Sequence, residues 1–395
     1  MWQDSPHYTP PANVRKMTDD LAFLPAWYAQ EGDCVFIDGQ APLPFFSRLP
    51  DGIRAPARPL ARKEIEANAA SLPRMEAAPW GLSPQSIHLF NELKRRYGLD
   101  IGVPVWKDEY TGLTSRRTAA ACLAEIKRRL PGTAFPRPPV FFSEWEAAED
   151  WLQQHPGAFV LKTPYSSSGR GLLWLDENRL SDSDRKRIKG ILRKQGSVSL
   201  ERALDKVVDF AMEFYSDGRG NIRYEGLSLF ETNSRGAYRG NRLQSQSAHE
   251  KELLKYAGKD TLNRIEQTVA HVLRDTFGAR YTGYLGVDML VYRDEEAFGI
   301  HPCLEINLRY TMGMAAIRIF ENYFGEGAEG IFNILYENDS RRAYGQHLLM
   351  EKAYPPVLKD GRLHEGYLSL CPVTEETHYI AYVLAASEKN RIFRL

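Results

Sequence analysis

Two neighbouring apolar stretches carry acidic side chains, and this pairing constrains the fold more than any other feature of the chain. Residues 284–292 are interrupted by Asp288, and residues 299–309 include Glu305 and Asn307. Side chains two apart in a strand leave it on the same face, so Glu305 and Asn307 point the same way. A buried carboxylate is costly unless it is paired, hydrogen-bonded or bound to a cation. Two such strands therefore predict a Mg²⁺ site, with a pair of edge strands carrying solvated acids as the alternative.

Length, charge and cysteine content limit the classes of protein to which this chain can belong. Its 395 residues suffice for two or three domains, and its 51 basic residues balance 51 acidic ones. The net charge therefore gives no indication of a nucleic-acid or membrane partner. The four cysteines are far apart and match no disulfide framework or zinc site, and no signal peptide or membrane-spanning run is recognised. We expect a globular cytoplasmic protein, and a homodimer is left open.

A serine- and glycine-rich turn between two predicted strands is the second informative stretch. The strands cover residues 158–162 and 171–175, and Lys162 ends the first of them. Small residues let backbone N–H groups approach an anion closely, so the turn predicts a phosphate-binding loop, with a mobile loop as the alternative. The lysine precedes the glycines, which excludes a P-loop. The residues of the turn are Ser166, Ser167, Ser168, Gly169, Arg170 and Gly171.

Helical periodicity alternates with strand patterns along the rest of the chain. Helices are predicted over residues 84–97, 116–130, 182–194, 260–277 and 312–324. Ser143 with Glu146 is expected to cap a further helix, and Asp260 is expected to cap the fourth helix of this series. The basic helix at 182–194 is interpreted as a solvated face, because no aromatic residues alternate with its charges.

Four motifs in this order resemble the ATP-grasp superfamily over about residues 115–324. The motifs are 159–162 with the turn 166–171, 199–204 before Asp209, Asp288 within 286–290, and Glu305 to Arg309. Each is weak alone, but four in the correct order at workable spacing are specific together. The resemblance implies binding of ATP with Mg²⁺ or Mn²⁺, and it leaves the substrate open.

The resemblance also implies a role for each motif. Lys162 would hold the α- and β-phosphates of ATP beneath the turn, and Glu201 would face the adenine amino group. Asp209 would accept hydrogen bonds from the ribose hydroxyls, with Glu213 as the alternative. The remaining implied contacts are the backbone of Arg202, Ala203 and Leu204 along the base, the metal ligands Asp288, Glu305 and Asn307, and Arg309 on the transferred phosphoryl group.

One position departs from the superfamily pattern. Members usually have a second phosphate-binding lysine on an earlier helix, where this chain has Arg116 and Arg117 after Ser115. An arginine can also bind phosphate, through the fork of its guanidinium. Arg116 and Arg117 are therefore candidate phosphate contacts, with surface arginines at a helix start as the alternative.

We predict five parts for the chain. An extended arm at 1–20 precedes an N-terminal α/β domain at 21–114, which is similar to a pre-ATP-grasp domain. The ATP-grasp small subdomain with the phosphate loop covers 115–200, and the large subdomain with the metal site covers 201–345. Strands at 346–395 would close the sheet. The expected fold class is thus a multidomain α/β and α+β protein with an ATP-grasp fold.

Most enzymes of this superfamily are ligases, so the resemblance implies a carboxylate–amine ligase that forms ADP. Such an enzyme transfers the γ-phosphate of ATP to a substrate carboxylate, and an amine or other nucleophile then displaces phosphate from the acylphosphate. Positioning and charge neutralisation suffice for this chemistry, so the protein needs no nucleophilic side chain. The alternatives are a small-molecule kinase and a regulatory module that binds ATP without turning it over.

A polar hairpin is the expected contact with the second substrate, together with the N-terminal domain. Arg239 is the preferred anchor, because a guanidinium can bind a carboxylate or a phosphate through two hydrogen bonds. A flexible hairpin with solvated arginines is the alternative. Other residues expected there are Arg235, Tyr238 and Asn241. His301, beside the metal strand, is interpreted as a structural residue rather than a base.

Overall fold

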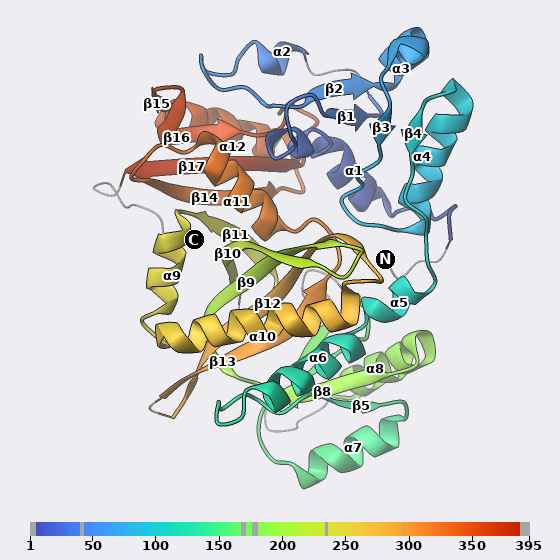
Figure 1. Ribbon diagram of the computed structural model, residues 1–395, viewed down its shortest axis with the longest axis vertical. Helices are drawn as coiled ribbons and strands as arrows, with labels where there is room; N and C mark the ends of the chain where they lie inside the picture. The colour runs from blue at the N-terminus through green and yellow to red at the C-terminus, as the bar shows by residue number, and fades with distance from the viewer. Residues whose placement is uncertain are drawn as a thin grey trace. The chain divides into compact units, whose positions relative to one another are not determined.

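A computed structural model of the chain describes residues 5–39, 43–166, 171–175, 181–233, 236–295 and 297–387. The chain divides into two compact units (Figure 1). Unit 1 contains Lys107–Arg239 and His249–Thr311, and unit 2 contains Gln3–Trp106, Gly240–Ala248 and Met312–Leu395. Each unit combines helices with sheets, so the prediction of a multidomain α/β and α+β protein is confirmed.

A small antiparallel sheet of unit 1 carries the predicted phosphate loop. Its strands run in the order β5-β8-β6-β7. Their bounds are β5 (Val140–Phe142), β6 (Phe159–Lys162), β7 (Leu172–Leu175) and β8 (Val198–Arg202). The strands predicted on either side of the loop are β6 and β7, which pair from Phe159 with Leu175 to Lys162 with Leu172. This register places Lys162 at the end of its strand, where the loop begins.

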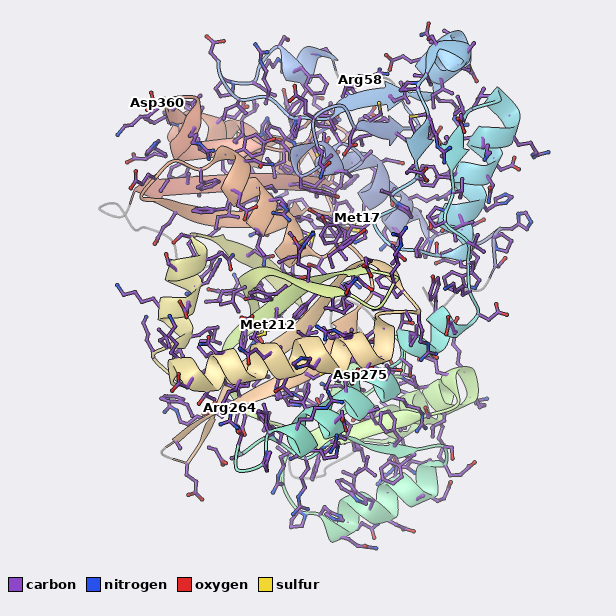
Figure 2. The ribbon with its side chains drawn as sticks, viewed as in Figure 1. Met17, Arg58, Met212, Arg264, Asp275 and Asp360 are labelled. Carbon is purple, nitrogen blue, oxygen red and sulfur yellow. The ribbon has the colours of Figure 1, made fainter. Side chains whose placement is uncertain are left out.

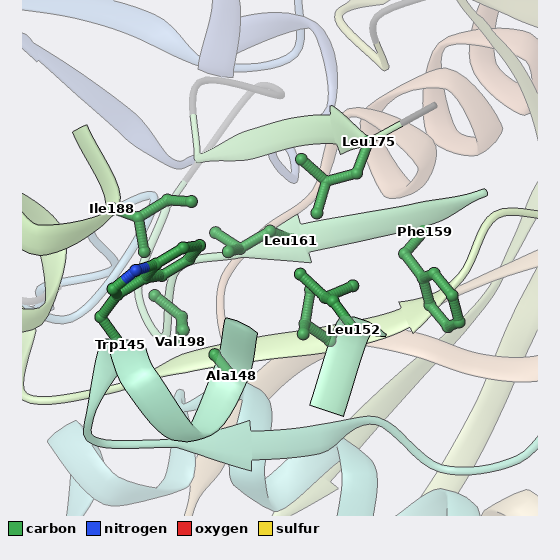
Figure 3. Close-up of a cluster of buried hydrophobic side chains, with 9 residues drawn as sticks. Trp145, Ala148, Leu152, Phe159, Leu161, Leu175, Ile188 and Val198 are labelled. Carbon is green, nitrogen blue, oxygen red and sulfur yellow. The ribbon is translucent and has the colours of Figure 1, made fainter. Parts of the chain in front are cut away.

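Two helices cover this sheet and form a core with it (Figure 3). They are α7 (Trp145–Gln154) and α8 (Asp182–Gln195). Trp145, Ala148 and Leu152 recur at helical spacing on α7, so they share one face. Figure 3 shows them beside Leu161 and Val198 of the sheet, and each of the five is at most 4% exposed. Burying one large apolar side chain contributes about 1.5–3 kcal/mol, so the sheet is a firmly packed support for the loop.

A second antiparallel sheet of unit 1 carries the acidic strands, in the order β13-β12-β9-β10. The bounds are β9 (Asp205–Asp217), β10 (Ile222–Thr232), β12 (Thr282–Asp294) and β13 (Ala297–Asn307). Leu285, Val287 and Met289 are fully buried on one face of β12. Since successive side chains alternate, Asp288 lies on the other face. The two acidic strands are therefore neighbours, as predicted, and β13 is an edge strand.

Two helices pack against this second sheet. They are α6 (Arg116–Arg129), which contacts β13 and α10, and α10 (Lys259–Phe277), which contacts β9 and β10. Arg129 Nη2 of α6 lies 2.7 Å from Asp275 Oδ2 of α10. Figure 2 labels Asp275 on α10 and Met212 on β9, whose side chain is buried. Through these contacts the first residue of α6, Arg116, is held beside the strand that carries Glu305.

The N-terminal part of unit 2 is a small α/β assembly. Two parallel strand pairs are β1 (Cys34–Ile37) with β2 (Arg58–Ala61) and β3 (Met75–Glu76) with β4 (Ile101–Gly102). The helices α3 (Arg62–Asn68) and α4 (Pro84–Tyr97) supply Ile65 and Leu93 to the core that includes Leu60 and Ile101. Gly98 ends α4 with a φ of +66°, which is the left-handed conformation that glycine adopts readily at this position. The predicted α/β character of this region is observed.

The C-terminal part of unit 2 is an antiparallel sheet in the order β11-β14-β17-β16-β15. The bounds are β11 (Tyr238–Leu243), β14 (Ala328–Tyr336), β15 (Val357–Lys359), β16 (Arg362–Ser369), β17 (Tyr379–Ser387) and the covering helix α12 (Ser340–Ala353). Tyr367, Ile380 and Leu384 form its core with Ala343 of α12. The two strands predicted in the tail are β16 and β17, whereas β14 and α12 were not predicted.

Remaining elements are α2 (Leu43–Phe46), α5 (Glu109–Leu113), α9 (Gln246–Leu253), α11 (Met312–Tyr323) and the 3₁₀ helices η1 (Leu24–Trp27) and η2 (Ala69–Ser71).

The prediction of an extended arm at 1–20 is wrong for its second half. Ala12–Asp20 forms helix α1, which packs against β17. The Asp20 carboxylate accepts hydrogen bonds from the backbone N–H groups of His378, at 2.9 Å, and Tyr379, at 3.1 Å. These tertiary contacts stabilise a short helix whose sequence alone gave no strong helix signal.

Two predicted helix caps are also corrected. The N-cap of α7 is Glu144 without a side-chain hydrogen bond, so Ser143 and Glu146 form no capping box. Helix α10 begins after Gly258, which places Asp260 in the first turn rather than at the cap. A carboxylate in the first turn still interacts favourably with the positive end of the helix dipole.

In unit 1, one sheet carries the predicted phosphate loop and a second sheet carries the acidic strands. Apart from the arm, the division of the chain into these parts stays a prediction. In the portion of the chain that the structure describes, no helix has the length and apolar character needed to cross a bilayer.

Candidate functional site

The register of β12 and β13 brings the predicted metal ligands together. Asp288 pairs with Glu305, and Gly286 pairs with Asn307, so all four positions lie on one face of the sheet. The Asn307 Nδ2 donates to Asp288 Oδ2 at 3.0 Å. Asn307 is buried, whereas the Glu305 side chain is 31% exposed. The two carboxylates therefore belong to paired positions, and the one on Glu305 is partly exposed.

The electrostatics of this cluster favour a cation. Burial and the facing Glu305 carboxylate raise the pKa of Asp288, because two negative charges close together oppose ionisation. A divalent cation bound between them would remove this repulsion. Within the described part of the chain no group of three or more His, Cys, Asp or Glu side chains is placed to hold a metal. Two carboxylates and an amide fit Mg²⁺, which commonly completes its shell with water and phosphate oxygens.

Arg116 joins the predicted metal cluster to the phosphate loop. Its Nη2 lies 3.1 Å from Glu305 Oε2 and donates to Ser166 Oγ at 3.2 Å. Its Nε donates to the backbone carbonyl of Thr163 at 3.0 Å. The side chain is only 10% exposed, so a charged guanidinium is held between the two motifs.

Arg117 points elsewhere. Its guanidinium carbon lies 4.4 Å from the centroid of the Phe141 ring, a cation–π contact on β5. Of the two arginines that sequence reasoning left open, Arg116 is therefore the one that lies between the loop and the acidic strands, and its role as a phosphate contact stays a prediction.

The loop after β6 is closed tightly at its base. The Thr163 N–H donates to the Gly171 carbonyl at 3.1 Å. A Cβ on Gly171 would lie 2.3 Å from Thr163 Oγ1 and 2.4 Å from Ser166 Cβ, so this position requires glycine. The other predicted loop residues, Ser167, Ser168, Gly169 and Arg170, lie outside the described residues.

Lys162 and Glu201 form an ion pair on neighbouring strands of the small sheet. Their side chains are 10% and 11% exposed, so both charges are largely removed from water. Removing either partner would leave the other charge buried without compensation, which destabilises the fold. Lys162 therefore has a fixed position at the mouth of the loop, and Glu201 is fixed with it.

The segment after Glu201 leads from β8 to β9. The Ala203 N–H donates to the Ala158 carbonyl at 3.0 Å, which ties the segment to the small sheet. The Arg202 guanidinium lies against the Phe159 ring and donates to the Pro156 carbonyl at 2.9 Å. The predicted adenine contact by the backbone of Arg202, Ala203 and Leu204 stays a prediction, with the Ala203 N–H already used within the protein.

Asp209 belongs to a small polar network that the sequence did not reveal. Lys206 Nζ lies 2.6 Å from Asp209 Oδ2, and Thr232 Oγ1 donates to the same oxygen at 2.7 Å. Asp209 is 9% exposed, and the paired Lys206 side chain is 34% exposed. A carboxylate fixed by these two partners can still accept a ribose hydroxyl at its other oxygen.

Glu213, the alternative ribose contact, is 2% exposed and accepts a hydrogen bond from the Thr311 side chain. Burial raises its pKa to about 8, while the Thr311 hydrogen bond and the nearby Arg309 charge oppose the rise. The Glu213 carboxyl is covered by the protein more completely than that of Asp209, which is 9% exposed, and the choice of ribose ligand stays a prediction. Arg309 also lies close enough to Asp288 to lower its pKa in part.

His301 lies on β13 near the Lys162–Glu201 pair and is 3% exposed. Burial lowers its pKa to about 4, so the ring is neutral at pH 7. The Cys303 N–H donates to His301 Nδ1 at 3.4 Å. These features agree with the structural role expected for it.

The predicted second-substrate residues are placed less completely. Arg239 is exposed on β11. Its neighbour Tyr238 has a phenol whose pKa is raised by burial well above its usual range. Asn241 is buried in unit 2, where its strand pairs with β14 at Phe332. Arg235 lies outside the described residues. The role of Arg239 therefore stays a prediction.

Sequence reasoning missed four residues at this site. They are Thr163, Lys206, Thr232 and Thr311, each of which contacts a predicted site residue or its backbone. Only Thr311 carried a usable signal, since it lies two residues beyond Arg309, the last residue of the fourth motif. The others are brought in by loop closure or cross-strand pairing.

Comparisons with known proteins find matches among solved structures and none by sequence. No family model and no curated protein matches the sequence. An ADP complex of N5-carboxyaminoimidazole synthetase from Staphylococcus aureus is 9% identical, with a TM-score of 0.48, covering 92% of this chain and 95% of that one. A biotin carboxylase–β,γ-ATP complex from Campylobacter jejuni is 13% identical, with a TM-score of 0.45, covering 76% and 68%.

A third solved structure is D-alanyl-alanine synthetase A from Vibrio cholerae, which is 13% identical with a TM-score of 0.38, covering 58% of this chain and 64% of that one. With identities this low and TM-scores below 0.5, these structures do not assign the site. The assignment depends on the arrangement of this chain's own side chains. All three structures are ATP-grasp enzymes, the superfamily that the four sequence motifs resemble.

Proposed function

We propose that the chain is an ATP-grasp ligase that uses ATP and Mg²⁺ to activate a substrate carboxylate as an acylphosphate. An amine or another nucleophile then attacks the acyl carbon, and ADP and phosphate are released. The observation that carries the proposal is the position of Arg116, whose guanidinium contacts both Glu305 of the acidic strands and Ser166 of the loop. One basic group thus connects a cluster suited to Mg²⁺ with a loop suited to phosphate.

The nucleotide would be held by the chain's own charges. Lys162 and Arg116 would bind phosphate oxygens, each exchanging its present carboxylate partner for the ligand. Glu201, released from Lys162, would accept from the adenine amino group. Asp209 would accept from the ribose hydroxyls.

The phosphoryl group would be positioned by the acidic strands. Asp288, Glu305 and Asn307 are the residues that would hold Mg²⁺, which supplies neutralisation of phosphate charge and alignment of the reacting oxygens. Arg309 would stabilise the charge that spreads over the transferred phosphoryl oxygens. Manganese has the same preference for oxygen ligands and would fit the same set.

Phosphate release tests this proposal directly. Purified protein would be incubated with ATP and Mg²⁺ against panels of amino acids, peptides and small carboxylates, each with and without an amine. A ligase releases ADP and inorganic phosphate in equal amounts and only when both substrates are present. ADP formation without phosphate release would indicate a kinase, and binding of MgATP without ADP formation in any panel would indicate a regulatory module.

Arg239→Ala is expected to raise the KM for the carboxylate substrate by about 10- to 100-fold, because a charge-assisted hydrogen bond contributes about 1.5–3 kcal/mol. The KM for MgATP should change little, since Arg239 is assigned only to the second substrate. Initial rates at varied carboxylate and saturating MgATP measure both quantities. Arg219→Ala, in the turn between β9 and β10, is a control, and an unchanged carboxylate KM in R239A would remove Arg239 from the site.

A further inference from the structure

Glu213 lies in the row of the sheet next to the acidic pair. Across β9 and β12 it pairs with Gly286, and across β12 and β13 Gly286 pairs with Asn307. On its other side Glu213 pairs with Gly226 of β10, where a bulge interrupts the register. The carboxylate therefore has a glycine on each neighbouring strand, which leaves room for its side chain to lie along the sheet.

The Glu213 side chain occupies the space beside Gly286 where a Cβ would lie. A Cβ on Gly286 would lie 2.6 Å from Glu213 Oε2 and 2.8 Å from Thr311 Cγ2. The Glu213 carboxylate thus crosses over the backbone of β12 and reaches Thr311, beyond the end of β13. A residue with a Cβ at position 286 would therefore displace one of these two side chains.

Thr311 is the last residue of the short segment that carries Arg309. Residues 308–311 follow β13, with Leu308 1% and Thr311 7% exposed. The Arg309 N–H donates to the Asn307 carbonyl at 3.0 Å, which turns the backbone directly after the last metal ligand. The segment is therefore fixed at its start by Asn307 and at its end by the hydrogen bond from Thr311 to Glu213.

We infer that Glu213 is a positioning residue for Arg309, which it holds beside the Asp288–Glu305 pair through its hydrogen bond with Thr311. This inference rests on the proposed function, since it assigns Glu213 to the step in which Arg309 acts on the transferred phosphoryl group. A buried carboxyl group costs folding free energy, and here it secures the geometry of a loop rather than contacting a ligand. Displacement of a reacting group by 1 Å can cost about 100-fold in rate, so such an anchor has a large effect on turnover.

The hydroxyl of Thr311 gives the sharpest kinetic test. Thr311→Val removes it with little change in shape, whereas Thr311→Ser retains it. T311V is expected to lower kcat about 10- to 100-fold with less than about a threefold change in the KM for MgATP, because a misplaced Arg309 affects the transition state more than the bound nucleotide. T311S should remain within about threefold of wild type.

A double variant separates positioning from stability. Glu213→Met with Thr311→Val replaces both partners by apolar side chains, so no buried polar group is left unpaired. Its urea unfolding midpoint is expected at or above that of wild type, while its kcat stays as low as that of T311V. A double variant that regains wild-type kcat would show that the hydrogen bond is only structural and would overturn the inference.

Ligand binding provides a readout without turnover. Calorimetry would compare MgADP alone with MgADP plus aluminium fluoride, which mimics the transferring phosphoryl group. T311V is expected to bind the mixture about tenfold more weakly and MgADP alone less than about twofold more weakly. Equal binding of the mixture by T311V and wild type would overturn the role of Glu213. Failure of the wild type to bind MgADP or turn over ATP would instead reject the proposed function, and the inference with it.

Discussion

Glu305→Ala is expected to lower kcat for ADP formation by at least about 100-fold at millimolar Mg²⁺. The change removes one of two facing carboxylates, and charge stabilisation by a correctly held metal is worth several kcal/mol. It also frees Arg116, whose Nη2 lies 3.1 Å from Glu305 Oε2, so the guanidinium loses its fixed position. Coupled assays of ADP formation over a Mg²⁺ titration measure both the rate and the metal requirement, and chelation of the metal should abolish the wild-type rate.

The matched control for this variant is Asp294→Ala. Asp294 is an exposed acid at the end of β12, on the same hairpin as Glu305 but beyond the cluster. D294A should keep the wild-type rate and metal dependence. If Glu305→Ala retained full activity at limiting Mg²⁺, the assignment of the metal ligands would be wrong.

Lys162→Met is expected to weaken MgATP binding by about 100-fold, because a buried charged partner of phosphate typically contributes about 2–5 kcal/mol. The variant should also lose about 3–5 kcal/mol of folding stability, since it leaves the Glu201 carboxylate buried without its partner. Calorimetry with a non-hydrolysable ATP analogue measures the first effect, and urea unfolding measures the second.

Two further variants distinguish lost binding from lost folding. Lys162→Met with Glu201→Gln removes both charges, so stability should return toward wild type while the affinity for the nucleotide stays low. Lys189→Met changes an exposed lysine on α8, whose side chain is 53% exposed, and should leave both quantities unchanged. Wild-type nucleotide affinity in the double variant would exclude Lys162 from the phosphate site.

Local spacing was enough to predict most elements of unit 1. Lys162 at the end of an apolar run and the small residues after it indicated β6 and a turn, and Gly171 proves to be required by close packing against Thr163 and Ser166. Such features depend on residues near in sequence, whose conformational preferences act locally. Elements stabilised by distant partners were not predicted: α1 depends on contacts with β17, and its Asp20 accepts hydrogen bonds from backbone N–H groups more than 350 residues away.

The sequence by itself determined that Glu305 and Asn307 share a face, because side chains alternate along a strand. Only the tertiary structure decided that Asp288 stands opposite Glu305, that Arg116 rather than Arg117 reaches this pair, and that Glu213 is hydrogen-bonded to Thr311. The physical reason is that register and side-chain direction are set by pairing between distant segments, where a shift of one residue would move every side chain to the other face.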